Sequence, residues 1–421
     1  MREMKDSGVA WIGEIPKSWN LERLQWHISE IKETNKPEKT KQILSLTNKR
    51  GVIPYEEKGA QGNVSKEDLS QYKLAYPDTI VANSMNVLIG SVGKCNYYGC
   101  VSPVYYVYKP NDGENLEFIN YIFQTEQFQK ELRRYANGIL EIRLRVSSDG
   151  ILKRKVAFPS TDEQQKIVVY LNQKLSQVDS LIANVQAQIE KLKTYKQSLI
   201  TEVVTKGLDP NAPMKDSGVE WMGNIPKKWV VIPSKYLFAN CDERRKENDV
   251  QLTASQKYGM ISQQEYMRRE NARVVLADKG LENWKHIEPF DFVISLRSFQ
   301  GGLEMSEVSG CATWHYVVLR ARQEIHPYYY KWLFKSSTYI TALQRTCNYI
   351  RDGQDLRYSN FVKVPLCIPA LVEQKQIADY LDAKCSQIDR LISLKESKIE
   401  KLQQYKRSLI YEYVTGKKEV V

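Results

Sequence analysis

The most regular pattern along the chain is a stripe of apolar residues spaced by alternating steps of four and three, and it occurs twice. The first stripe runs from Leu171 to Leu192, and the second runs from Leu381 to Leu402 with Lys395 interrupting it. Heptad spacing of this kind is typical of long amphipathic helices, and a single helix cannot bury its own stripe. We therefore predict helices over 161–206 and 371–416 that pack on each other as an antiparallel coiled coil. The alternative is that each helix packs separately on its neighbouring domain.

The stripe positions are also the residues that we expect at the coiled-coil and subunit interface. They are Leu171, Leu175, Val178, Ile182, Ile189, Leu192, Leu381, Ile388, Ile392, Ile399 and Leu402.

The stretches between these helices have shorter apolar runs, punctuated by Gly and Asn, which predict two mixed α/β domains. Each also has one longer amphipathic pattern, which predicts a single helix. The expected strands are Thr79–Val81, Val87–Ile89, Val104–Tyr108, Phe292–Leu296 and Trp314–Leu319, and the expected helices are Phe118–Tyr135 and Tyr328–Thr346.

A sequence repeat frames these domains. Met4–Val9 returns as Met214–Val219, and more than half of the positions in 163–205 are identical in 373–415. The intervening stretches, about 20–160 and 230–370, hardly match. A period of this length is the size of a domain. Similar frames around dissimilar inserts predict one scaffold that holds two domains with different binding surfaces.

Charge and composition narrow the function classes. The net charge is +11 at pH 7, and most of the excess lies in the two inserts, which favours a polyanionic partner. The seven cysteines form no CxxC pair and the four histidines are scattered, so we expect reduced thiols and no metal site. No apolar run approaches eighteen residues, and the N-terminus lacks the apolar core of a signal peptide. We expect a cytoplasmic protein.

Catalytic motifs are missing from the sequence. An amino-methyltransferase needs a Gly-rich turn and an Asn/Asp-Pro-Pro-aromatic motif, and we find neither. The segment Gly90–Cys95 resembles a shortened phosphate loop, but its first Gly is too close to Lys94 and a Cys replaces Ser/Thr. We interpret it as a β-turn that directs Lys94 toward DNA. We expect no catalytic residue and no cofactor in this chain.

The repeated motifs resemble one protein family. MKDSGV-x-W-x-G-x-IP-K-x-W is followed by EQ-x-x-I-x-x-YL, by IEKL-x-x-YK-x-SLI-x-E-x-VT and by the connector TKGLDPNAPMKDSGVEW. This order is similar to that of the specificity subunit of type I restriction–modification enzymes, and the likeness covers the whole chain.

The resemblance implies an α+β protein with circular pseudo-twofold symmetry. Target recognition domains at 1–160 and 214–370 would be separated by two conserved coiled-coil helices at 161–206 and 371–416, with a connector at 207–213. Each domain would read one half of a bipartite site in double-stranded DNA. The helices would dock two methyltransferase subunits, and restriction/translocase subunits would join them. Adenine-N6 methylation and ATP-dependent cleavage, with S-adenosylmethionine, ATP and Mg²⁺, would belong to the partners, and no membrane would be involved.

Arg suits guanine, and Asn or Gln suits adenine, in the major groove. On that basis we predict DNA contacts in both inserts, with ordinary solvated surface charge as the alternative at each position. We assign Arg133–Arg134 and Arg268–Arg269 to helix surfaces instead, and Tyr105, Tyr106 and Tyr108 to core packing. The predicted contacts are Lys49, Arg50, Asn83, Asn86, Lys94, Arg143 and Arg145 in the first insert, and Lys257, Arg297, Ser298, Gln300, Arg351 and Arg357 in the second.

Two other functions remain open at this point. One is a coiled-coil scaffold or regulatory protein that does not read DNA, and the charge on the inserts argues against it. The other is a self-contained methyltransferase or nuclease, and the missing cofactor and metal motifs argue against that.

Overall fold

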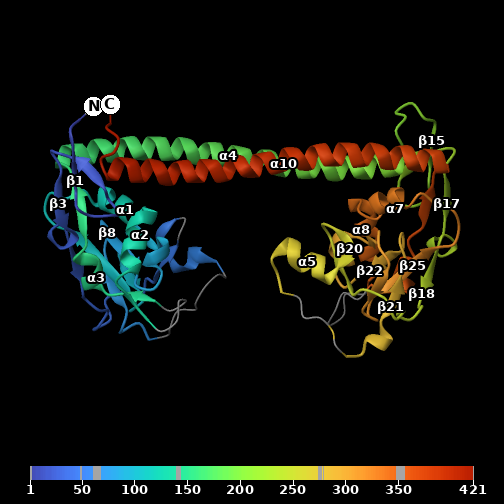
Figure 1. The fold of residues 1–421 in the computed structure, drawn as a ribbon, viewed down its shortest axis with the longest axis horizontal. Coiled ribbons are helices and arrows are strands. Elements are labelled where there is room, and N and C mark those ends of the chain that lie inside the picture. The colour runs from blue at the N-terminus through green and yellow to red at the C-terminus, as the bar shows by residue number, and fades with distance from the viewer. Residues whose placement is uncertain are drawn as a thin grey trace. The chain divides into compact units, whose positions relative to one another are not determined.

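The computed structural model describes residues 2–47, 50–59, 68–138, 144–273, 277, 279–347 and 356–420. The chain divides into two compact units (Figure 1). Unit 1 comprises Met1–Gln186 with Ser397–Val421, and unit 2 comprises Ala187–Glu396. Each long helix therefore contributes one part to each unit, and each unit is described below by itself.

Unit 1 is built around a four-stranded antiparallel sheet of order β4-β11-β8-β9. The core combines this sheet with α1, α2 and the start of α4, and Phe118, Phe123 and Tyr108 are fully buried in it. The elements of unit 1 that precede α4 are β1 (Met4–Asp6), β2 (Glu14–Pro16), β3 (Asn20–Arg23), η1 (Leu24–Trp26), β4 (Ile28–Ile31), β5 (Leu44–Thr47), β6 (Gly51–Pro54), η2 (Tyr55–Lys58), β7 (Lys73–Ala75), β8 (Thr79–Asn83), η3 (Val87–Ile89), β9 (Val92–Cys95), β10 (Gly99–Val101), β11 (Tyr105–Pro110), α1 (Leu116–Gln124), α2 (Glu126–Arg133), β12 (Ala136–Asn137), β13 (Arg145–Val146), α3 (Ser148–Leu152) and β14 (Lys155–Phe158).

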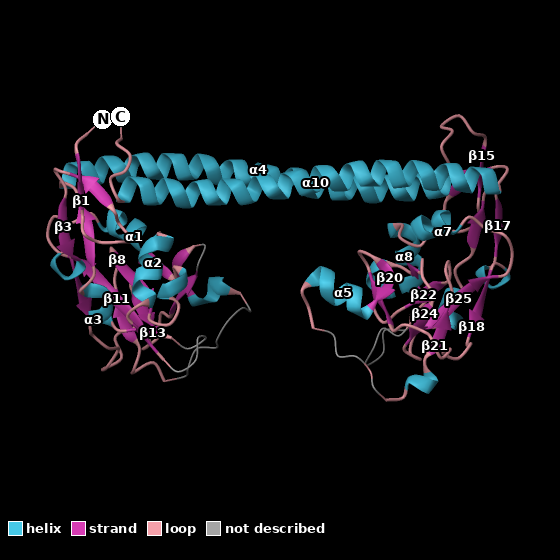
Figure 2. Ribbon diagram, in the orientation of Figure 1, coloured by secondary structure: helices cyan, strands magenta, loops and turns pink. Residues whose placement is uncertain are grey.

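Unit 2 repeats this plan with a sheet of order β18-β25-β22-β23. Figure 2 shows the same mixture of short strands and helices in each unit. The elements of unit 2 between the long helices are β15 (Met214–Asp216), β16 (Asn224–Pro226), β17 (Val230–Ile232), η5 (Ser234–Tyr236), β18 (Phe238–Cys241), β19 (Leu252–Ser255), β20 (Gly259–Ser262), α5 (Gln263–Glu270), η6 (Leu281–Asn283), β21 (Lys285–Ile287), β22 (Phe292–Ile294), α6 (Ser298–Gly301), β23 (Glu304–Met305), β24 (Gly310–Ala312), β25 (Val317–Ala321), α7 (Pro327–Leu333), α8 (Ser337–Arg345), α9 (Tyr358–Phe361) and β26 (Leu366–Ile368).

Several details of the predicted secondary structure were wrong. The single helix expected in each insert is two helices, because the chain turns extended at Thr125 in unit 1 and at Ser336 in unit 2. Each hydroxyl bonds back to a carbonyl of the preceding helix, which competes with helix continuation. Val87–Ile89 is a 3-10 turn, ended by Gly90 in the left-handed conformation.

The long helices α4 (Thr161–Lys206) and α10 (Leu371–Val414) pair antiparallel. In unit 1 the rings of Tyr170 and Tyr413 pack in a tilted arrangement with 4.7 Å between centroids, and Lys406 forms an ion pair with Asp179. In unit 2 Lys196 pairs with Asp389 at 2.6 Å. Along these pairs the residue numbers increase on α4 while they decrease on α10. The expected antiparallel coiled coil is therefore confirmed.

The apolar stripe faces the interior of this pairing to different depths. Seven of the expected interface residues are buried and four are half-buried. The buried ones are Leu171, Leu175, Val178, Ile189, Leu381, Ile388 and Ile392, and the half-buried ones are Ile182, Leu192, Ile399 and Leu402.

The repeated frame packs against the end of each long helix. After α4, Gly207 is left-handed at φ +74°, and after α10, Gly416 is left-handed at φ +71°. A side chain at Gly207 would meet Trp229 and Pro226, and one at Gly416 would meet Trp19 and Pro16. Each of these glycines therefore ends its helix and allows the chain to pack closely on the repeated frame.

Candidate nucleic-acid interface

The first candidate surface of unit 1 is the turn that follows the central strand β8. The side chain of Asn83 is buried, and its Oδ1 accepts a hydrogen bond from the N–H of Met85 at 3.1 Å. Asn86 is exposed three residues later. Asn83 thus shapes the turn, whereas Asn86 presents its amide to solvent.

Arg145 lies beside the same turn. The N–H of Val146 donates to the carbonyl of Ser84 at 3.1 Å, and the hydroxyl of Tyr106 donates to the carbonyl of Val146 at 3.1 Å. Arg145 is exposed. The structure therefore brings Asn86 and Arg145, two of the predicted contacts, to one edge of the sheet.

Unit 2 has an equivalent turn after β22. Ser295 takes the place of Asn83, because its Oγ accepts from the N–H of Arg297 at 3.3 Å. Ser298 is buried, and its Oγ accepts from the N–H of Ser295 at 2.8 Å. Arg297 and Gln300 are exposed. Here too, buried polar side chains hold the backbone while their neighbours point outward.

A buried ion pair stabilises the turn that follows β22 in unit 2. Lys335 pairs with Glu304 and also donates to the carbonyl of Gly301 at 2.9 Å. Burial lowers the pKa of Lys335 and raises that of Glu304, and the attraction between the two charges opposes both shifts. Gln344 donates to the carbonyl of Phe299. The segment that carries Arg297 and Gln300 is therefore fixed by α8 and by the connection between α7 and α8.

Three other predicted contacts belong to neighbouring segments, and each is in an ion pair. Arg50 pairs with Glu57, Lys94 pairs with Asp78 at 3.1 Å, and Lys257 pairs with Glu270 at 3.2 Å. The expected β-turn at Gly90–Cys95 is wrong for Lys94, which lies within strand β9.

Arg357 precedes α9, where its N–H donates to Oδ1 of Asn360 at 3.1 Å. Lys49, Arg143 and Arg351 lie outside the described residues. The DNA contacts as a set stay predictions.

The residues assigned to structural roles agree better with expectation. Arg268 and Arg269 lie in α5, and both guanidinium groups bond to Glu265, which lowers the pKa of that carboxyl to about 2. Tyr108 is fully buried, and Tyr105 and Tyr106 are half-buried.

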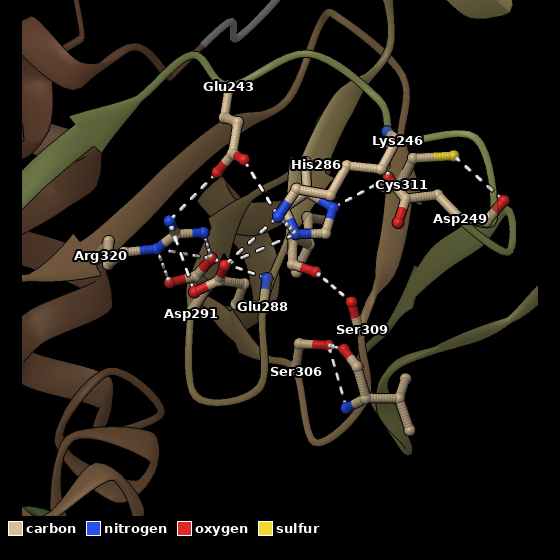
Figure 3. Close-up of polar contacts among 12 residues, drawn as sticks. Glu243, Lys246, Asp249, His286, Glu288, Asp291, Ser306, Ser309, Cys311 and Arg320 are labelled. Atoms are coloured by element: carbon tan, nitrogen blue, oxygen red, sulfur yellow. Dashed lines mark hydrogen bonds and ion pairs between the residues drawn. The ribbon is translucent and has the colours of Figure 1, made fainter.

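A polar cluster in unit 2 was not anticipated (Figure 3). His286 is buried, with Nδ1 2.8 Å from Oδ2 of Asp249 and Nε2 2.8 Å from Nζ of Lys246. Arg320 bonds to Asp291 through two nitrogens.

This cluster contains a possible metal-ligand set. Among the residues that the structure describes, Glu243, His286 and Glu288 are close enough together to share an ion. Lys246 lies 3.0 Å from Glu243 and 3.6 Å from Glu288, so an ammonium group already compensates these carboxylates. We interpret the cluster as a clamp that holds the segment after β18 on β21.

All seven cysteines are free thiols, five of them buried. Burial raises the pKa of the Cys367 thiol to about 11, which is unfavourable for nucleophilic chemistry. In the described part of the chain, every helix is too short or too polar for a membrane span.

The fold is similar to those of two solved structures. The chain aligns with the crystal structure of the HsdS subunit from Thermoanaerobacter tengcongensis at a TM-score of 0.54, covering 98% of this chain and 99% of that one at 13% identity. It aligns at a TM-score of 0.70 with a chain from a structural study of complex assembly and conformational transition in the type I R-M system, covering 95% and 98% at 13% identity.

Sequence comparison gives the same resemblance. The putative type I restriction enzyme MjaX specificity subunit of Methanocaldococcus jannaschii is 22% identical over 426 residues, which cover 96% of this chain and 95% of that protein. No protein-family model matches the chain. The resemblance inferred from the repeated motifs is confirmed over almost the full length.

Proposed function

We propose that this chain is the DNA specificity subunit of a type I restriction–modification enzyme. Residues 1–160 and 214–370 each read one half of a bipartite site in double-stranded DNA. The chain performs no catalysis. It works in the cytoplasm with two methyltransferase subunits and with restriction/translocase subunits, which use S-adenosylmethionine, ATP and Mg²⁺.

The observation that carries this proposal is the pair of equivalent turns after β8 and β22. Both are held by a buried side chain that accepts an N–H bond, Asn83 in one unit and Ser295 in the other. Their exposed residues differ, with Asn86 in one and Arg297 and Gln300 in the other. One backbone platform with different base-reading side chains is what two unlike half-sites require.

The helices supply the second part of the proposal. A reader of a split site must fix the separation of the two halves along the duplex. Helix α4 has 46 residues and α10 has 44, which corresponds to about 65–70 Å at 1.5 Å per residue. We infer that the paired helices set the half-site spacing and dock the methyltransferase subunits.

The decisive experiment is footprinting of DNA by the chain assembled with its methyltransferase subunits. The site comes from methylome sequencing of a host that expresses the system. We expect two protected segments, and replacement of residues 20–160 by another member's insert should change one half-site alone. A single continuous protected patch, or a change in both halves, would contradict the proposal. DNA binding that does not respond to salt would favour a scaffold role instead.

A further inference from the structure

An exposed tryptophan occupies a turn at the end of the unit 2 sheet. Trp314 lies in the turn between β24 and β25, which is closed by the N–H of Tyr316 donating to the carbonyl of Thr313 at 3.0 Å. The indole is 54% exposed. One of its faces stacks on His315, with 3.5 Å between ring centroids and 28° between planes. The imidazole therefore covers and supports one face of the indole.

This turn lies next to the candidate DNA-contacting turn of the same unit. Ile294, the last residue of β22, pairs with Val317, the first residue of β25. The segments that flank those two residues, 295–302 and 313–316, therefore lie at the same end of these two strands. Burial raises the pKa of Tyr316, and the nearby Arg297 guanidinium opposes that rise. Leu296, at the same end of the strands, is also 54% exposed.

We propose that Trp314, propped by His315, is a base-stacking contact in the half-site that unit 2 reads. The inference rests on the function proposed above. An adenine methyltransferase must take its target base out of the stack, which exposes faces of neighbouring bases. An indole stacks on any nucleobase face, and apolar side chains inserted at a base step hold it open. Arg297, the base-reading residue proposed above, lies near Tyr316, two residues after Trp314.

In the part of unit 1 that the structure describes, no tryptophan occupies the equivalent turn. Its equivalent turn is closed by the N–H of Tyr105 donating to the carbonyl of Ser102 at 3.0 Å. Pro103 and Val104 stand there in place of Trp314 and His315. The effect of Trp314 should therefore be confined to one half-site.

The test uses the complex of the chain with its methyltransferase subunits. The DNA is a duplex that carries the recognition site identified by methylome sequencing. Trp314→Ala should weaken binding by about fivefold or more, because stacking contributes about 1–3 kcal/mol per base and about 1.4 kcal/mol corresponds to tenfold. Trp314→Phe should keep most of the affinity. The slope of log K against log salt should not change with either variant, because no phosphate contact is removed. The matched control is Trp26→Ala in unit 1, where the indole is 57% exposed.

A second readout reports stacking directly. Part of the tryptophan fluorescence of the complex should be quenched when DNA is added. That part should be missing in Trp314→Phe and present in Trp26→Ala. 2-Aminopurine placed in the half-site of unit 2, but not in the other, should become more fluorescent with Trp314→Ala.

Three results would overturn the inference. Wild-type affinity and quenching in Trp314→Ala would exclude a base contact while leaving the proposed function intact. Loss of methyltransferase capture by Trp314→Ala would make Trp314 a protein-docking residue. Failure of the wild-type complex to bind bipartite DNA would overturn the proposed function, and the inference with it.

Discussion

The indole of Trp19 donates a hydrogen bond of 3.0 Å to the carboxylate of Glu163, across 144 residues of chain. Trp229 and Glu373 repeat it at the same separation and the same distance. Both tryptophans are buried. Each bond joins the repeated frame to the first turns of a long helix. The orientation of that helix on its domain is therefore fixed by the frame itself.

Replacing Glu163 should loosen this joint. Glu163→Gln removes the charge and one of the two acceptor oxygens, so the side chain can no longer accept from both the buried indole of Trp19 and the guanidinium of Arg2. We therefore expect a loss of about 1–3 kcal/mol in the free energy of unfolding. Urea unfolding measures it. The control is Glu190→Gln, whose carboxylate contacts Lys193 on the helix surface. Equal effects of the two variants would contradict the structural role.

Charges placed in the helix stripe should disrupt assembly. Ile182→Asp combined with Ile392→Asp puts two carboxylates at half-buried and buried positions of the stripe. We expect weaker capture of the methyltransferase in pull-downs, because a buried unpaired charge opposes helix pairing. Ser180→Asp, on the exposed face of α4, is the matched control. Normal capture by the double variant would contradict the proposed docking.

The ion pair of Lys335 and Glu304 offers a test that links stability to DNA reading. Lys335→Met leaves Glu304 buried without its partner, which typically costs about 3–5 kcal/mol. The double variant with Glu304→Gln should recover part of that loss in urea unfolding. Because Lys335 holds the carbonyl of Gly301, affinity for one half-site should fall as well, and the other should be unaffected.

Glu265 should titrate far below an ordinary carboxyl. Arg268 and Arg269 lower its pKa from 4.5 to about 2. A carboxyl with a lowered folded-state pKa contributes its stabilisation above the unfolded pKa and loses it as the pH falls through the folded value. The contacts of α5 should therefore persist between pH 4.5 and about 2. NMR titration of the Glu265 carboxyl measures this, and Arg268→Ala with Arg269→Ala should return the pKa toward 4.5.

Arg297 should determine sequence preference in one half-site. Arg297→Ala should cost about 1–3 kcal/mol against the preferred base and relax the choice at one position, as expected for an arginine on guanine. Selection from randomised half-sites measures the preference. A uniform loss across all sequences, with a salt slope reduced by about one, would identify a phosphate contact instead.

The sequence predicted the elements whose pattern is long and local. A heptad stripe of several turns has few competing interpretations, and α4 and α10 follow it. The breaks at Thr125 and Ser336 were missed because apolar periodicity continues across them. At each break a single side-chain hydroxyl, bonded to a carbonyl of the preceding helix, favours the extended backbone conformation. Val87–Ile89 has β-forming residues, but Gly90 ends a turn there.

The candidate site was predicted in composition rather than in geometry. Residue type does not reveal that Asn83 and Ser298 shape their turns from inside while Asn86 and Arg297 face outward. Trp314 was placed in a strand, because the apolar run from Trp314 to Leu319 hides a turn before Val317. The cluster around His286 joins residues that are far apart in the chain, and no local spacing signals it.

The first repeated frame and the residues after α10 meet in unit 1. Arg2 donates to the carbonyl of Gly416 at 3.1 Å, and Lys417 donates to the carbonyl of Ile12 at 2.7 Å. At the corresponding place in unit 2 the backbone simply runs on through 207–213. The two frames are therefore seated on the ends of the long helices in two ways, by side-chain contacts to residues 416–417 in unit 1 and by the continuous backbone of 207–213 in unit 2.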